Sequence, residues 1–155
     1  MKIKIVAALS IFIISSMFGA AGLYAGTEVP DEFKMENKIY NSHDKGIVLF
    51  THKKHIDDYK AWCWECHHNE NNQPLNDLKI GDDVKKCSEC HKKPEYIKGK
   101  KAKGLSKEEK REYHANAIHD NCKGCHKKFN KKMKLKSKDE GAAQVTCKQC
   151  HPKKK

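Results

Sequence analysis

The apolar residues of this 155-residue chain are concentrated at its amino terminus. Residues 5–24 carry no charged side chain, and they follow a basic start that contains Lys2 and Lys4. Small residues then lead into a polar sequence after Ala25. These are the three parts of a secretory signal peptide, so we expect residues 1–25 to direct export and to be removed. The alternative is a retained membrane anchor, because about 20 apolar residues are also enough to span a bilayer.

The remaining residues, 26–155, have the length of a single domain but little hydrophobic patterning. Lysines are abundant and large aliphatic side chains are few. Such a chain cannot build much of a core from its own side chains. We therefore predict a mainly α fold with few elements, in which short helices and long loops wrap around something other than packed side chains. A small β-hairpin near the amino terminus of this domain completes the expected architecture.

A capping-box sequence predicts that a helix begins after Ser106. Ser106 and Glu109 have the Ser-x-x-Glu spacing of a capping box, and good helix formers continue from there to His119. In a helix with 100° per residue, His114 and His119 point about 140° apart. Only one of these two histidines is therefore expected to face the interior.

All eight cysteines belong to four copies of one motif, Cys-x-x-Cys-His. This motif attaches c-type haem, because two thiols form thioethers with the porphyrin and the adjacent histidine binds the iron. We therefore predict four covalently bound haems c, which bring the apolar surface that the side chains lack. The attachment residues are Cys63, Cys66 and His67; Cys87, Cys90 and His91; Cys122, Cys125 and His126; and Cys147, Cys150 and His151.

Paired cysteines have two other common uses. They bind structural zinc together with histidines, or they form disulfides in exported proteins. Neither use accounts for a histidine at the same place in every copy while no cysteine is left over. Haem attachment is therefore the favoured interpretation.

Six histidines lie outside the haem-ligand positions of the motifs. His68 adjoins His67 and cannot reach the opposite face of the same haem, so we expect it to bind the iron of a neighbouring haem. His119 is likewise too close to the third motif to serve that haem. The others are His43, His52, His55 and His114.

The pair His52 and His55 is three residues apart, so one helical turn or a tight loop can direct the two side chains at two different irons. His43 has turn-forming neighbours and is expected to be exposed.

This layout resembles the class III cytochromes c, the small tetrahaem periplasmic cytochromes of sulfate-reducing bacteria, over nearly all of residues 26–155. Besides the four motifs in order, the resemblance rests on "FKME" at 33–36, an apolar strand-like stretch ending in "VLFTHKKH" at 48–55, "CWECHH" at 63–68 and "IHD" at 118–120. It implies a second histidine ligand for each iron. In the order of the haems, these ligands would be His52, His68, His55 and, rather than His114, His119.

The resemblance also matches Phe50 to an aromatic residue that packs between haems, although simple core filling is another role for it. Two features depart from the family. Many members have four residues between the cysteines of the second and fourth motifs, whereas all four motifs here have two. Residues 56–62, "IDDYKAW", also lengthen the segment before the first motif. Both departures bear on which histidine reaches which iron.

An iron bound by two protein imidazoles has no open position for a substrate and changes oxidation state with little rearrangement. We therefore expect a low-potential, bis-histidine electron carrier rather than an enzyme, and the resemblance implies a role in anaerobic sulfate respiration. The alternatives are a multihaem reductase with one open iron and a subunit of a conductive extracellular filament.

Charge bears on the partner. Residues 26–155 hold 30 basic and 20 acidic side chains, a formal +10 that haem propionates offset in large part. Residues 127–138 contain seven lysines and no acid, which would steer an acidic redox protein to one haem edge. The resemblance implies a periplasmic hydrogenase, a formate dehydrogenase or a membrane redox complex, and a periplasmic location. Nucleic acid is not expected, and membrane contact is expected only with an uncleaved amino terminus.

Overall fold

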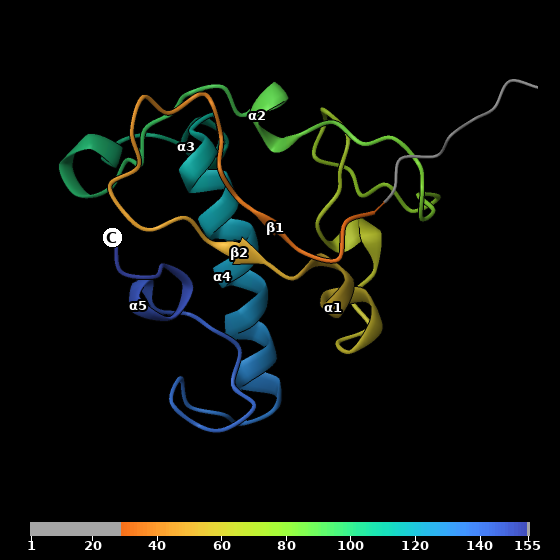
Figure 1. Cartoon of the computed structure of the whole chain (residues 1–155). Coiled ribbons are helices and arrows are strands. Elements are labelled where there is room, and N and C mark those ends of the chain that lie inside the picture. Colours follow the sequence, from red (N-terminus) through yellow and green to blue (C-terminus); the bar gives the residue numbers. More distant parts are fainter. Residues whose placement is uncertain (1–28, 155) are drawn as a thin grey trace, which may run out of the picture.

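The computed structural model describes residues 29–154, and the expected signal peptide, residues 1–25, lies outside the described residues. Strands β1 (Phe33–Lys34) and β2 (Leu49–Phe50) pair antiparallel, with Phe33 opposite Phe50. The helices are α1 (His52–Asp57), α2 (Cys87–Cys90), α3 (Lys107–Arg111), α4 (His114–Lys132) and α5 (Cys147–Cys150), and the 3-10 turns are η1 (Cys63–Glu65) and η2 (Gly99–Ala102). Most other residues lie in loops and turns (Figure 1). The predicted fold class, including the small hairpin, is confirmed.

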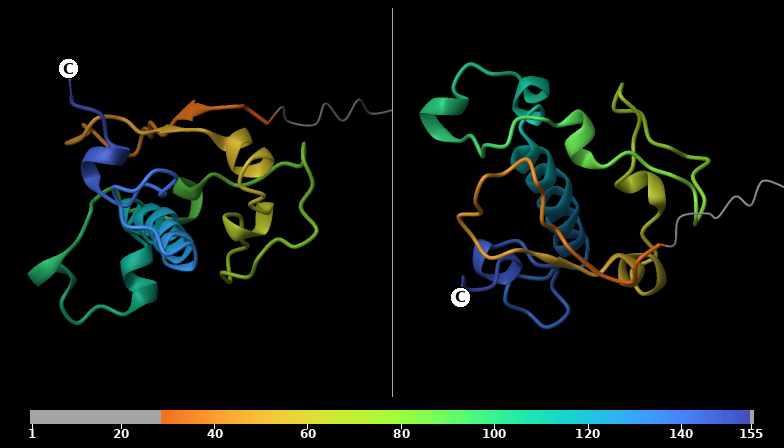
Figure 2. Two further views of the ribbon diagram at one scale, coloured as in Figure 1. Left: turned by 90° about the horizontal axis from the view of Figure 1, so that it is seen from below. Right: turned by 45° about the horizontal axis from the view of Figure 1, so that its top comes forward.

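Helix α4 is the longest element and lies at the centre of the molecule (Figure 1). Helices α1 and α5 lie on opposite sides of it, and this arrangement persists in the other two views (Figure 2). Helix α3 lies beside the start of α4. The first and fourth cysteine motifs are therefore presented from the two flanks of a helix that contains the third motif.

The start of α3 confirms the predicted capping box. The backbone N–H of Glu109 donates to the Ser106 hydroxyl at 3.1 Å, and the Ser106 N–H donates to the Glu109 carboxylate at 2.7 Å. The prediction of one continuous helix to His119 is wrong, because α3 ends at Arg111 and α4 begins at His114. The Lys93 N–H donates to the Glu112 carbonyl and the His114 N–H donates to the Lys93 carbonyl, so tertiary hydrogen bonds hold this junction extended.

Two asparagines of α4 fasten loops to the helix. Asn116 donates to the Ile97 carbonyl and accepts from the Ile97 N–H, both at 2.9 Å. Asn130 makes the same pair of bonds with Ala143, at 2.8 and 2.7 Å. Each side-chain amide therefore satisfies both the backbone N–H and the backbone carbonyl of one loop residue, as a neighbouring strand would in a sheet.

The described part of the chain has almost no side-chain core. Ile97 is the only buried hydrophobic residue between positions 29 and 154, and His114 and Asn130 are the only buried polar ones. Several large apolar side chains are exposed, and Trp62, for example, is 63% exposed. Burial of apolar area is the main driving force of folding, so this arrangement needs apolar surface from another source. No helix within these residues is long and apolar enough to cross a membrane.

Candidate haem sites

Each cysteine motif forms a single helical turn. The backbone N–H of the motif histidine donates to the carbonyl of the first cysteine at 2.8 Å in the first, second and fourth motifs, and the third motif lies inside α4. Positions i, i+3 and i+4 lie on one face of a helix. The two thiols and the imidazole of each motif are therefore directed to the same side, as attachment of one flat group requires.

Three of the four turns are capped from within the motif. The side chains of Glu65, Glu89 and Gln149 accept hydrogen bonds from the backbone N–H of the residue before the first cysteine, at 2.9, 2.8 and 3.1 Å. The third motif has Gly124 at this position and needs no cap, because α4 continues through it. The sequence analysis missed these caps, although a Glu or Gln before the second cysteine was their signal.

Four pairs of imidazoles face each other across a constant gap. Two nitrogens about 2.0–2.1 Å from one metal, each about 1.1 Å from its ring centre, place the ring centres roughly 6.3 Å apart. The structure reproduces this spacing four times. The centroid distances are 6.3 Å for His52 and His67, 5.9 Å for His68 and His91, 6.2 Å for His55 and His126, and 6.1 Å for His119 and His151.

These four pairs are the ones that the family resemblance implies. The longer segment 56–62 and the uniform motif spacing leave the placement of the histidines unchanged. Helix α1 directs His52 and His55 at different partners from one turn, as predicted from their spacing. Binding of iron by each pair stays a prediction.

The pairs are linked to one another through short stretches of backbone. His67 and His68 are neighbours in the chain and belong to the first and second pairs. His119 and His126 belong to the fourth and third pairs, and seven residues of α4 place them within about 20° of the same face. Together with α1, these links connect all four sites.

Backbone carbonyls orient most of the paired imidazoles. A carbonyl can only accept, so the ring nitrogen facing it is the protonated Nδ1, and Nε2 is left with a lone pair for a metal. Five of the eight paired histidines have this contact. The acceptors are Thr51 for His55 at 2.8 Å, Asn69 for His68 at 2.7 Å, Arg111 for His91, Gln144 for His126 at 2.6 Å and Gly46 for His151 at 2.8 Å.

His52 and His119 differ from these five. Their Nδ1 atoms are buried and make no hydrogen bond of normal geometry. Burial lowers the pKa of both imidazoles, as it does for His67 and His91. These four rings are therefore neutral at neutral pH, which is the form that binds a metal.

His114 is placed away from the imidazole pairs. It is 7% exposed, and its Nδ1 lies 2.8 Å from the hydroxyl of Tyr40. His119, on the same helix, is the residue opposite His151. The prediction that His43 is exposed is wrong, because it is half-buried with its ring 5.2 Å from that of Tyr40, and Lys154 donates to its carbonyl. No local sequence pattern predicts this small cluster.

Phe50 packs beside one imidazole of the first pair and one of the third. Its ring centre is 5.8 Å from His52 and 4.7 Å from His55, and it also contacts Phe33 across the hairpin at 5.4 Å. The strand pairing thus holds an aromatic side chain against the α1 histidines of the first and third pairs.

The cysteines do not favour the two alternative uses. All eight thiols are free, so none forms a disulfide, and burial raises the pKa of Cys66 and Cys122 to about 11. In the range 29–154 no three His, Cys, Asp or Glu side chains converge as a metal site would need. Paired imidazoles, adjacent thiols and a missing core together fit haem c.

Comparison with known proteins agrees with this fit. The model of the class III cytochrome C family matches residues 27–151, most of the chain. A search of curated proteins gave no match.

Proposed function

Because the chain belongs to the class III cytochrome c family, we propose that it is an electron carrier with four haems c, each bound between two histidines. Family membership implies multihaem electron transport with covalently attached haem. The number four rests on the four motifs. The observation that carries the proposal is the repeated spacing of the imidazole pairs, 5.9–6.3 Å.

When bound, each haem supplies an iron that alternates between ferric and ferrous states. The chain supplies the axial ligands and the contacts that hold these ligands in one orientation. Two imidazoles per iron exclude water and other ligands, and the carbonyl contacts at Nδ1 hold the rings in place during oxidation and reduction. Ligation by nitrogen alone favours the low potentials expected for this carrier.

The backbone links between the pairs support rapid exchange within one molecule. The adjacent residues His67 and His68 would bind the first and second haems. His52 and His55, on one turn of α1, would bind the first and third haems. Such links keep the sites close and rigid, so electrons can move among them without a change of fold.

A reductase with one open iron is less well supported. It needs a motif histidine without a facing imidazole, and each of the four has one. We therefore assign no substrate-binding iron.

Histidine variants test this assignment. We expect His119→Ala to produce one haem that binds carbon monoxide, with the other three unchanged, whereas His114→Ala, on the same helix, should produce none. Visible spectra of the reduced proteins with and without carbon monoxide give the readout. Carbon monoxide binding in the His114 variant, or none in the His119 variant, would contradict the proposed ligands.

We further propose that the protein works in the periplasm and exchanges electrons with an acidic redox protein such as a hydrogenase, a formate dehydrogenase or a membrane complex. Lysines 127–138 follow the third motif and begin within α4. Steering by these charges predicts that electron exchange slows as ionic strength rises. Stopped-flow rates of Lys128→Glu and of the exposed control Lys45→Glu, measured with an acidic redox protein, test this surface. Equal rates would contradict it.

A further inference from the structure

Two surfaces of opposite charge lie at different ends of the molecule. Residues 56–84, here called the acidic surface, contain seven acidic and two basic side chains, and all seven acidic ones are exposed. Residues 127–138, here called the lysine surface, contain seven exposed lysines and no acid. Residues 69–84 lie near the top of Figure 1 and the segment after α4 lies at the bottom, and the right view of Figure 2 separates them in the same way.

Both surfaces also expose large apolar side chains. Ile80, Trp62 and Tyr59 of the acidic surface are 72%, 63% and 56% exposed, the three largest exposed fractions among the large hydrophobic residues that the structure describes. The lysine surface exposes Met133 and Phe129. Exposed apolar and aromatic side chains surrounded by charges are typical of protein–protein interfaces.

The acidic surface has a shape fixed by its own hydrogen bonds. The side-chain oxygen of Asn69 accepts from the backbone N–H groups of Asn71 and Gln73, both at 3.0 Å. The carboxylate of Asp82 accepts from the Lys79 N–H at 2.7 Å. A surface that is already ordered loses less conformational freedom when it binds a partner.

Neither surface neutralises its charge within one molecule. The described residues form three ion pairs, and only that between Glu70 and Lys85 involves the acidic surface. No lysine of the lysine surface takes part in any of the three. Like charges therefore remain close together on each surface, and a partner of opposite charge relieves their repulsion.

This chain itself provides such a partner, because its two surfaces complement each other in charge and both expose apolar side chains. We infer that the acidic surface of one molecule binds the lysine surface of a second copy. The two surfaces differ, so the contact is head to tail, and a pair of copies still presents one free surface of each kind. The lysine surface proposed above for an acidic redox protein would thus also accept a second copy.

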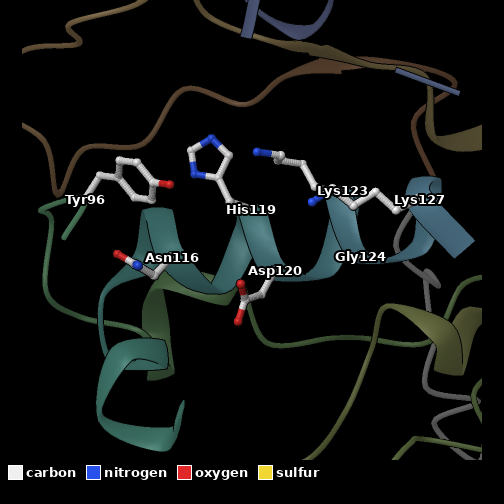
Figure 3. Close-up of a pocket in the computed structure, with 7 residues that line it drawn as sticks. All are labelled: Tyr96, Asn116, His119, Asp120, Lys123, Gly124 and Lys127. Carbon is white, nitrogen blue, oxygen red and sulfur yellow. The ribbon is translucent and has the colours of Figure 1, made fainter. Parts of the chain in front are cut away.

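The contact would bring predicted haem sites of two molecules together. The acidic surface contains the first cysteine motif. Lys127 of the lysine surface follows His126 of the third motif and lines the same hollow as His119, as Figure 3 shows. Electrons would then pass from the third or fourth haem of one copy to the first haem of the next. This inference rests on the proposed tetrahaem carrier and adds exchange between its copies.

Sedimentation velocity of the full holoprotein, followed at the Soret band, tests the association. Charges act over about 30 Å at about 0.01 M salt and over about 3 Å at about 1 M. We expect an average mass above that of the monomer in low salt, which rises with protein concentration, and a monomer in high salt.

Cross-linking locates the contact. A carbodiimide joins carboxylates to amines, and a mixture of isotope-labelled and unlabelled protein distinguishes links between copies from links within one. We expect the links between copies to join acids of the acidic surface to lysines of the lysine surface.

Charge reversal tests the same contact independently. Asp58→Lys combined with Asp77→Lys changes two exposed residues of the acidic surface that belong to no ion pair, and should weaken the association by about tenfold or more. Glu95→Lys combined with Glu108→Lys is the matched control, because it makes the same change of net charge at exposed positions outside both surfaces, and its effect should be much smaller. The acidic-surface variant should not slow electron exchange with an acidic redox protein, because its lysine surface is unchanged.

A monomer at every salt concentration, links between other surfaces, or equal effects of the two double variants would overturn the inference. Binding of mitochondrial cytochrome c, a basic redox protein, by a chain that stays monomeric would assign the acidic surface to another partner and also overturn it. Haem counts and carbon monoxide spectra on the same samples separate this failure from failure of the carrier. A monomer with four closed haems refutes the association alone, and an open or missing haem in the unchanged protein refutes the carrier.

Discussion

Substitution of Gly46 by alanine should loosen the fourth site without touching a predicted ligand. The Gly46 carbonyl accepts from Nδ1 of His151 at 2.8 Å, so this loop orients the motif histidine of that site. A Cβ added at Gly46 would lie 2.2 Å from the Pro152 carbonyl oxygen, whereas real Cβ contacts essentially never fall below 3.0 Å. The two segments must therefore separate by about 0.8 Å, and the clash is with backbone rather than with a flexible side chain.

The size of the effect follows from these two contacts. Overpacking of this kind costs about 1–3 kcal/mol. Loss of the hydrogen bond to His151 adds about 0.5–1.5 kcal/mol. We therefore expect the free energy of unfolding to fall by about 1.5–4.5 kcal/mol, with the change concentrated at the fourth haem.

Denaturant unfolding of the oxidised holoprotein measures the free energy, and the NMR signals of the fourth haem report the local change. Lys45→Ala is the control, because its side chain is exposed and the Gly46 carbonyl remains in place. If Gly46→Ala and Lys45→Ala are equally stable and the fourth haem is unperturbed, the close approach of the two loops is refuted.

Four further predictions concern the scaffold. Asn130→Ala should lower the free energy of unfolding by about 1–3 kcal/mol in denaturant titrations, because two hydrogen bonds to Ala143 are lost. Ser106→Ala should lower it by about 1 kcal/mol through loss of the α3 cap. Burial raises the pKa of Tyr40, so the fold should lose stability as the pH rises past about 10, where tyrosine in the unfolded chain ionises first; Tyr40→Phe should lack this loss in alkaline melts. Finally, a chain made without haem attachment should show the circular dichroism of an unfolded protein, because Ile97 is the only buried hydrophobic residue among those described.

The sequence was a good guide wherever local spacing controls the outcome. The cysteine motifs form single turns, the Ser106 box caps α3, and His52 and His55 diverge from one turn of α1. The small number of large aliphatic residues likewise predicted a fold almost without a side-chain core, as the structure shows. These features depend on residues within about four positions of one another or on composition alone.

Features that depend on distant backbone groups could not be predicted in this way. The break between α3 and α4 is imposed by Lys93, about 20 positions away, and no local signal marks it. The cluster of His43, Tyr40 and His114 joins residues more than 70 positions apart. Three carbonyl partners of the paired histidines are also remote in sequence, such as Gly46 for His151. Spacing left the choice between His114 and His119 open, and the resemblance favoured the residue that the structure places opposite His151.

The central claim is that four haems are each closed by two histidines. The most direct measurement is the visible spectrum of the purified protein, oxidised, reduced and reduced under carbon monoxide, together with the ratio of haem to protein. We predict four haems per chain, a sharp low-spin α band and no shift with carbon monoxide. A shift in one quarter of the haem would reveal an open iron and favour a reductase, and a chain without a Soret band would contradict haem attachment altogether.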